Sequence, residues 1–193
     1  MSKSNSGLFS GTIGDKLSHR ASKSMAESID TTPTESDIIA SRVKGLDLRE
    51  HPLKHRELSS AKMAELRKKA DARTINKKEY KSYNSNKRLA KRRQTGVENF
   101  WKQETKRIIR GEATTRNWTP EQRHDIVNNI RPKANGKTIQ SHHSYSVSKY
   151  PHLANRGEVI FPATFREHLY EWHGGNFKKS LPGRPIKPRK HSN

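Results

Sequence analysis

The sequence predicts an α+β chain, with a mostly helical and partly disordered N-terminal region and a small C-terminal module of short strands and helices. The apolar content is 29% and the net charge is +21, a combination that leaves too few apolar side chains for one core spanning 193 residues. Helix-favouring residues dominate the middle of the chain, and capping and turn signals cluster after it. We therefore divide the chain into a disordered or linker-like part (1–57), a basic helical region (58–115), a compact module (116–185) and a basic tail (186–193).

The N-terminal half offers few strong signals. Residues 1–40 are rich in Ser, Thr, Gly and Asp, and the stretch 7–14 is punctuated by glycine as a linker is. A short helix is expected at 36–43, followed by two or three helices between 59 and 110. The best apolar stripe in this part lies near 98–110, so the last of these helices is expected to pack on the C-terminal module.

The C-terminal module begins with a clear helix start. Thr119 can cap the helix, Pro120 suits its first position, and Gln122 completes a capping box, so a helix is expected to run to about residue 130. The remaining expected elements are a turn at 134–137, a strand at 138–140 followed by a His-His pair, a strand at 159–161 ended by Pro162, and a helix from Thr164 to Trp172 ended by two glycines.

The charge of the chain points to nucleic acid. Lys and Arg number 40 against 19 acidic residues, and a polyphosphate releases counterions when basic side chains neutralise it. An acidic protein partner is compatible with this charge. Stable membrane insertion is not expected, because an anionic membrane would need an apolar face that the chain lacks, and no apolar run is long enough to span a bilayer. The first 30 residues hold no signal peptide.

The absence of cysteine narrows the chemistry further. It excludes disulfides, thiolate zinc sites and cysteine nucleophiles. Any metal must therefore be held by histidine, carboxylate, asparagine or backbone oxygen. Five of the ten histidines fall between His142 and His173. A strand end that faces a helix can bring such side chains together on one ion. His168 and His173 are five residues apart, whereas a spacing of four stacks two ligands, so the helix would have to end or tighten before His173.

Three short motifs together carry a family resemblance. They are Ser141-His142-His143, the Pro-x-Thr-x-x-Glu-His run that ends at His168, and the His-Gly-Gly-Asn run 173–176. Over residues 116–185 the chain resembles HNH/endonuclease VII superfamily nuclease toxins with an SHH (GHH-like) signature. The resemblance implies a ββα-metal (HNH/His-Me finger) module that cleaves phosphodiester bonds with a divalent metal, Mg, Zn, Mn or Ni. It implies DNA, or less often RNA, as substrate, and a polymorphic toxin or secreted effector as the setting.

The resemblance also suggests roles for individual residues. His143 would be the general base, and its ordinary pKa near neutrality suits that task. His142, His168 and His173 would be metal ligands. Relatives often carry an orienting asparagine where this chain has Val159. The residues expected to support the site are Glu167, Asn155 and Asn176, and those expected to bind phosphate are Lys137 and Arg184. Glu167 has an equally good alternative role in a helix salt bridge.

A toxin of this kind implies an acidic immunity protein that covers its basic cleft. It also implies secretion by a non-classical route, or delivery into a target cell, with action in the cytoplasm. The main alternative is a non-enzymatic basic nucleic-acid-binding protein whose histidines hold a structural metal. A third reading is a secreted antibacterial protein that permeabilises membranes. Metal-dependent plasmid nicking that is lost with His143→Ala favours the nuclease, and tight binding without cleavage favours the main alternative.

Overall fold

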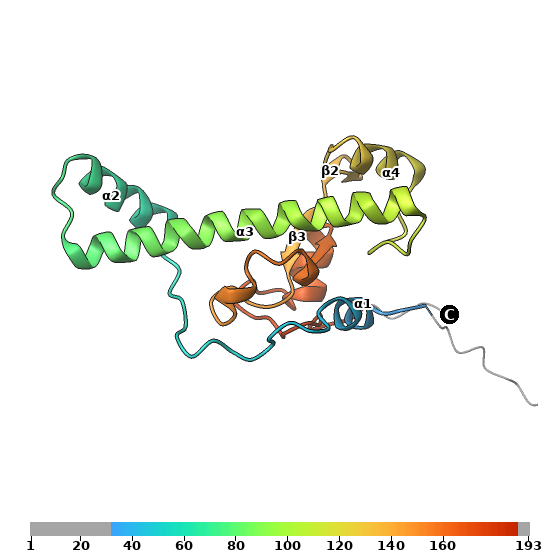
Figure 1. Ribbon diagram of the computed structural model, residues 1–193, viewed down its shortest axis with the longest axis horizontal. Coiled ribbons are helices and arrows are strands. Elements are labelled where there is room, and N and C mark those ends of the chain that lie inside the picture. The colour runs from blue at the N-terminus through green and yellow to red at the C-terminus, as the bar shows by residue number, and fades with distance from the viewer. Residues whose placement is uncertain (1–31, 189–193) are drawn as a thin grey trace, which may run out of the picture. The chain divides into compact units, whose positions relative to one another are not determined.

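The computed structural model describes residues 32–188 (Figure 1). The linker expected at 7–14 and most of the basic tail lie outside this range. Within it, residues 33–57, expected to be linker-like, include the helix α1 (Glu35–Arg42). Thr34 and Asp37 form a reciprocal capping box at its start, which satisfies two backbone N–H groups that the first turn leaves free. Ile39 of α1 is fully buried, so this segment contributes to the core.

Two helices follow, in agreement with the expected two or three. They are α2 (Ser60–Asp71) and α3 (Lys77–Arg110), and α2 lies against the first part of α3. The 34-residue α3 is a single continuous helix (Figure 1). A capping box between Asn76 and Glu79 starts it. Gly111 ends it in the left-handed conformation, with φ +65°, which glycine adopts without steric cost.

One stripe of α3 carries most of the packing. Leu89, Gly96, Phe100 and Glu104 are buried and recur at helical spacing, so they face the same side. The second half of α3 thereby contacts α4 (Pro120–Val127), η2 (Gly157–Val159) and β4 (Ile160–Ala163). Further residues of the main core come from other helices, from strands and from the segments that connect them. They include Val43, Trp118, Ile126, Leu153, Val159, Ile160, Phe161 and Trp172.

The helix α4 (Pro120–Val127) has the expected capping box between Thr119 and Gln122 and the expected proline in its first turn. It ends three residues before the predicted boundary. A two-stranded hairpin follows, built from β1 (Lys133–Ala134) and β2 (Lys137–Thr138). Asn135 and Gly136 connect the strands with φ of +50° and +74°, as a tight hairpin turn requires, so the predicted turn is confirmed.

The central sheet consists of β3 (Gln140–His143) and β4 (Ile160–Ala163), which pair antiparallel. The prediction placed the His-His pair after the first strand, but both histidines belong to β3 because the pairing continues to His143 and Ile160. Pro162 was expected to end the second strand. It lies inside β4 instead, which a two-stranded sheet permits because each strand has one free edge.

The connection between β3 and β4 contains two short 3-10 helices, η1 (Pro151–Leu153) and η2 (Gly157–Val159). After β4, Thr164 caps a helical segment as predicted, and most of that segment is the π-helix η3 (Glu167–Trp172). The glycine pair 174–175, both at positive φ, follows it. The order is therefore strand, loop, strand and helix, with a mixture of helices and small sheets across the described chain.

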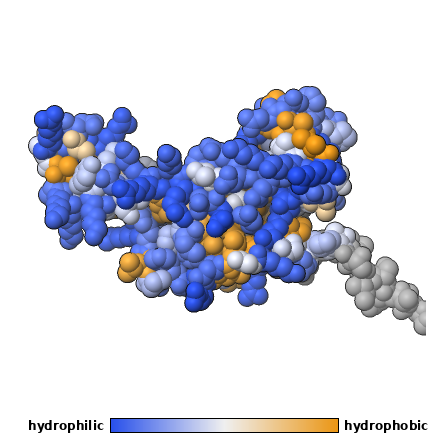
Figure 2. Space-filling model, viewed as in Figure 1, coloured by the Kyte–Doolittle hydropathy of each residue, from blue (hydrophilic) through white to orange (hydrophobic). Residues whose placement is uncertain are grey.

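The surface is largely hydrophilic, as Figure 2 shows along the visible face of α3. Hydrophobic atoms are visible at the end of this view that holds α4, and in that region Val127 and Ile130 are 42% and 52% exposed. Between residues 32 and 188, no helix combines the length and the apolar character needed to cross a membrane. The long α3 carries charged side chains on most of its surface.

Candidate metal centre

Three histidines that lie far apart in the sequence come together at one point. His142 belongs to β3 and His168 to η3, and His173 is the first residue after η3. One nitrogen atom of each ring lies within 4.8 Å of the corresponding atoms of the other two. The ring centroids form a nearly equilateral triangle, with separations of 4.8, 4.9 and 4.9 Å. The spatial convergence expected for these three side chains is present.

The π-helix explains how His168 and His173 meet. In an α-helix, residues five apart do not lie on one face, and the helix was therefore expected to end or tighten before His173. It widens instead. The backbone N–H of His173 donates to the carbonyl oxygen of His168 at 3.2 Å, which is the i to i+5 bond of a π-helix. This wider turn brings the two rings side by side.

Backbone and side-chain acceptors orient two of the rings. His168 Nδ1 donates to Gln140 Oε1 at 2.6 Å, and His173 Nδ1 donates to the carbonyl oxygen of Lys179. Each ring therefore carries its proton on Nδ1 and keeps the lone pair of Nε2 available. This is the arrangement that metal-binding histidines commonly adopt, because the acceptor fixes both the tautomer and the ring orientation.

His142 is the most buried of the three. Its Nε2 atom is buried and has no hydrogen-bond partner among residues 32–188. Burial lowers the pKa of His142 well below its usual value, and the neighbouring imidazoles add to the effect. Burial also lowers the pKa of His168 to about 4, with His173 as a smaller cause. Both rings are thus neutral at pH 7, which is the state that binds a metal.

His143 follows His142 on β3 but makes a different contact. Its Nε2 donates to the carbonyl oxygen of Ala154 at 3.0 Å, because a carbonyl can only accept. The lone pair of His143 is therefore on Nδ1. Burial lowers the pKa of His143 to about 4, the bond to Ala154 opposes this, and the positive charge of Arg93 adds to the lowering. The pKa of His143 is therefore below the near-neutral value expected from the sequence, because the ring is buried. The ring is neutral at pH 7, and its Nδ1 atom carries the lone pair that can accept a proton.

The four histidines line one cleft of about 490 Å³. Its other walls come from distant parts of the chain, and they include Arg93 on α3 and Glu57 in the segment before α2. The Arg93 guanidinium lies 3.4 Å from the Glu57 carboxylate. Ser146, Ser148, Lys178 and Ser180 add polar groups to the rim. A cleft of this size, lined by four imidazoles and by Arg93 and Lys178, can hold an anionic group beside the three-histidine cluster.

Glu167 does not join the histidine cluster. Its two carboxylate oxygens form a two-point ion pair with Arg116, with separations of 2.5 and 3.0 Å, and one of them accepts from the backbone N–H of Thr164 at 2.8 Å. Arg116 also donates to the carbonyl oxygen of Pro162 at 3.0 Å. His168 lies on the helix that begins near Glu167. The ion pair of Glu167 with Arg116 therefore links the start of this helix to the end of β4.

The other candidate residues lie elsewhere. Asn155 Oδ1 accepts from Arg92 at 2.9 Å, and Asn176 Oδ1 accepts from the backbone N–H of Lys178. The Ala154 carbonyl occupies the orienting position next to His143 that was expected for an asparagine. Lys137 in β2 and Arg184 near the C-terminus are exposed, and neither is among the described residues that line the cleft.

Three contributors were not singled out from the sequence. Gln140 precedes His142 by two residues, so both lie on one face of β3, and this alternation could have identified it. Phe177 stacks near both His168 and His173, with ring centroids 5.4 and 5.1 Å away. Arg93 lies about 50 residues before His143, and no local pattern links the two.

Comparison with known proteins finds a similarity to a family of nuclease toxins. Residues 83–164 match the Tox-GHH family model, described as a GHH signature containing HNH/Endo VII superfamily nuclease toxin. This segment, which is less than half of the chain, is therefore similar to GHH-signature nuclease toxins. The match starts inside α3, earlier than the resemblance noted from residue 116. It includes His142 and His143 but ends at Thr164, so the nuclease toxin match does not reach His168 or His173. No curated protein and no solved structure matches the chain.

The signature of the nuclease toxin family has glycine where this chain has Ser141. The Ser141 hydroxyl accepts from Trp101 Nε1 of α3 at 3.1 Å. That contact ties the strand of the His-His pair to α3, most of which also lies within the matched range. The matched residues therefore include the helix that supports β3 as well as the strand itself.

Proposed function

We propose that this chain is a metal-dependent endonuclease that hydrolyses phosphodiester bonds in nucleic acid, with DNA as the preferred substrate. Three groups of residues carry the proposal. His142, His168 and His173 hold a divalent metal ion, His143 is the general base, and the surrounding β3, β4 and η3 form a ββα-metal module. The observation that supports this best is the meeting of three imidazole nitrogens within 4.8 Å in a cleft that also contains His143.

The residues present fit a metal ion. His142 has a buried nitrogen without a partner in the described range, and the rings of His168 and His173 are each oriented by an acceptor on their far side. A buried polar atom of this kind is rare in folded proteins unless something binds it. Three imidazole ligands favour a borderline transition metal such as Zn²⁺ or Ni²⁺ over Mg²⁺, which prefers oxygen ligands.

A bound divalent cation would supply positive charge that neutralises the scissile phosphate and stabilises the departing oxygen. Side chains of the protein supply the proton acceptor and a further positive charge. His143 accepts the proton of an attacking water at Nδ1, because its Nε2–H is held by Ala154. Arg93 brings a positive charge to the same cleft, where it attracts the phosphate. The hydrogen bond to Ala154 keeps the His143 ring in the orientation that proton transfer requires.

The nuclease toxin family also suggests how the chain is used. We propose that it acts as a toxin that is delivered into a target cell, and that an acidic immunity protein protects the producer. The net charge of +21 supports the second point, because an inhibitor that covers the cleft must complement a basic surface. A small acidic protein encoded beside this chain is the expected partner.

Plasmid nicking tests the proposed function. Metal-free protein is supplied with Mg²⁺, Mn²⁺, Ni²⁺ or Zn²⁺, and the wild type is compared with His143→Ala, His142→Ala and His124→Ala. His124 is an exposed histidine on α4 and serves as the matched control. Wild type and His124→Ala are expected to cleave with at least one metal. His143→Ala and His142→Ala are expected to lose cleavage by about a hundredfold or more.

Metal binding separates the two roles. His142→Ala is expected to lose the metal, and His143→Ala is expected to retain it while losing cleavage. If the wild type binds DNA tightly and binds the metal but cleaves neither DNA nor RNA with any of the four ions, the chain is a nucleic-acid-binding protein with a structural metal. RNA of the same sequence, tested in parallel, measures the substrate preference.

A further inference from the structure

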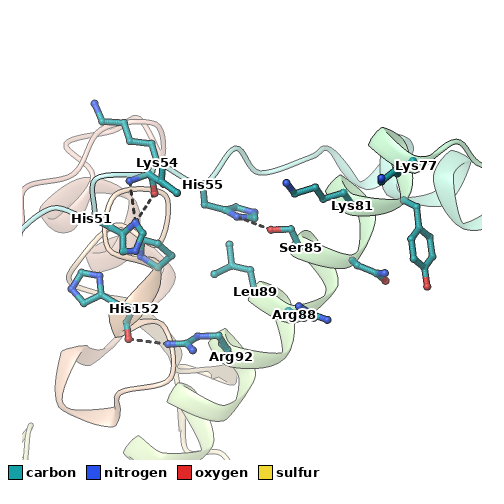
Figure 3. Close-up of a pocket in the computed structure, with 14 residues that line it drawn as sticks. His51, Lys54, His55, Lys77, Lys81, Ser85, Arg88, Leu89, Arg92 and His152 are labelled. Carbon is teal, nitrogen blue, oxygen red and sulfur yellow. Dashed lines mark hydrogen bonds between the residues drawn. The ribbon is translucent and has the colours of Figure 1, made fainter.

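A second hollow, distinct from the metal cleft, lies along the first half of α3. It encloses about 890 Å³ between α3, the segment 51–55 and the start of η1 (Figure 3). Lys77, Lys81, Arg88 and Arg92 line its α3 side. Their spacings of four, seven and four residues place them on one face of the helix. We call this hollow the α3 groove.

Every Lys or Arg that lines the α3 groove lacks an acidic neighbour in the described part of the same lining. Lys54 adds a fifth basic side chain from the facing segment, and no aspartate or glutamate is among the described residues that line the groove. The side chains of Lys77, Lys81 and Arg88 make no hydrogen bond or ion pair within residues 32–188. Elsewhere on the same helix the pattern differs, since Arg93 pairs with Glu57 and Arg107 with Glu104. Lys77, Lys81 and Arg88 are thus three cations of the groove without an acidic partner in the described part of the chain.

Two histidines offer further unpaired groups. His55 Nε2 and His152 Nδ1 are both buried, both residues line the α3 groove, and neither atom has a hydrogen-bond partner in the described part of the chain. The opposite nitrogen of each ring is engaged, by Ser85 and by the carbonyl oxygen of Asp47. Arg92 connects the two sides of the groove, because its guanidinium donates to the carbonyl oxygen of His152 at 2.9 Å (Figure 3).

The α3 groove adjoins the metal cleft. Arg92 lines the groove and Arg93 lines the cleft, and the segment 51–57 borders both, with His55 on one side and Glu57 on the other. At 1.5 Å per residue, the basic face of α3 from Lys77 to Arg92 extends for about 22 Å. That length corresponds to about six phosphates of one DNA strand, spaced 3.4 Å apart along the duplex axis. A mononucleotide would occupy only a fraction of it.

We propose that the α3 groove binds the phosphodiester backbone of a polynucleotide beyond the bond that is cut, so that α3 guides the strand into the metal cleft. The inference rests on the proposed nuclease function for the identity of the strand. The occupant is a polyanion with a regular repeat of negative charge, which matches a line of unpaired cations on one helix face. Binding in the α3 groove makes the chain selective for long polynucleotides over short phosphodiesters.

Binding of a fluorescently labelled 20-base-pair DNA duplex to metal-free protein tests the inference. The variant Lys77→Gln/Lys81→Gln/Arg88→Gln removes three charges from the α3 groove. The control Lys102→Gln/Lys106→Gln/Lys133→Gln removes three exposed charges outside both hollows. At about 100 mM salt the groove variant is expected to bind at least tenfold more weakly, with a salt-dependence slope reduced by about 2 to 3. The control is expected to change affinity less than threefold.

Cleavage separates this inference from the proposed function. Bis(4-nitrophenyl) phosphate is too short to reach the α3 groove, so the groove variant is expected to cleave it at the wild-type rate while cleaving plasmid at least tenfold more slowly. A wild type that cleaves neither substrate contradicts the proposed function. In that case the duplex affinities of the groove and control variants still test whether the groove binds a polynucleotide. Equal duplex affinity of the groove and control variants overturns the inference.

Circular dichroism and urea unfolding check that each variant folds, and the single variant Lys81→Glu repeats the binding test with one exposed residue. A poly-glutamate chain of equal charge serves as the competing class of partner. If it displaces the duplex from wild type and groove variant equally well, the groove does not select a polynucleotide backbone and the inference is overturned.

Discussion

Gly96 on α3 lies directly against the carbonyl oxygen of Ala154, with no room for a Cβ atom between the two residues. The same oxygen accepts the hydrogen bond from His143 Nε2. The helix therefore supports the loop whose carbonyl orients the proposed base. Gly157 makes a second close approach to α3, since a Cβ there would lie 2.6 Å from the backbone nitrogen of Phe100. Both glycines let the loop between β3 and β4 sit against α3 backbone to backbone.

Replacing Gly96 with alanine tests this packing. The added methyl group collides with backbone, which cannot rotate away as a side chain can, so Gly96→Ala is expected to lower the free energy of unfolding by about 1–3 kcal/mol. It is also expected to slow cleavage, because the Ala154 carbonyl moves. Urea unfolding measures the first effect, and Lys102→Ala on the exposed face of α3 is the control. A Gly96→Ala protein as stable as that control contradicts the packing argument.

Gln140 is expected to act on the metal through His168. Gln140→Leu removes the acceptor of the His168 Nδ1 proton and leaves the three proposed ligands in place. Loss of such an orienting partner costs about 10- to 100-fold in metal affinity. Gln140→Glu keeps an acceptor oxygen and is expected to retain most of the affinity. Competition with a chromogenic chelator measures both constants, and equal affinities for the leucine and glutamate variants would exclude the positioning role.

Glu167 is expected to be a structural residue. Its carboxylate is paired with Arg116, so Glu167→Gln should weaken the link between β4 and the helix that carries His168 without removing a metal ligand. The melting temperature is expected to fall, with a loss of about 1–2 kcal/mol in stability. The metal stoichiometry should remain that of the wild type. A variant of normal stability that binds no metal would instead identify Glu167 as a ligand.

The most buried charge in the described chain is Glu104, which is fully inaccessible. Its carboxylate accepts from Thr115, from Trp118 Nε1 at 2.7 Å and from Arg107 at 3.0 Å, and it lies near Arg42 of α1. Glu104→Gln leaves these donors poorly matched and two arginines without their counter-charge. A loss of about 3 kcal/mol in the free energy of unfolding is expected.

The exposed Glu98 on the same helix provides the matched control for that experiment, since Glu98→Gln removes an equal charge at the surface. Chemical denaturation of both variants at pH 7 gives the comparison. Similar midpoints for the two proteins would mean that the buried network is not needed for stability.

Local signals in the sequence predict much of the fold. The capping box of Thr119 with Gln122, the Asn135-Gly136 turn and the Thr164 cap all form as expected, because each depends on residues within three or four positions. Trp118 and Trp172 are both buried. Strand boundaries were less accurate, since pairing across the sheet decides where β3 and β4 end.

The site was predicted less completely because its parts are brought together by tertiary structure. His168 and His173 have the wrong spacing for an α-helix, and only the π-helical turn makes them neighbours. Arg93 and Glu57 reach the cleft from α3 and from the segment before α2, far from the His-His pair in sequence. A backbone carbonyl orients His143, and sequence patterns of side chains carry no signal for such a group.

Titration of Zn²⁺ into metal-free protein, followed by calorimetry, tests the central claim most directly. We expect one ion per wild-type chain, with affinity at least a hundredfold weaker in His168→Ala and His142→Ala. His143→Ala should bind Zn²⁺ as the wild type does. If His168→Ala binds the ion with unchanged affinity, or if His143→Ala loses it to the same extent as His142→Ala, the three histidines do not form the metal centre.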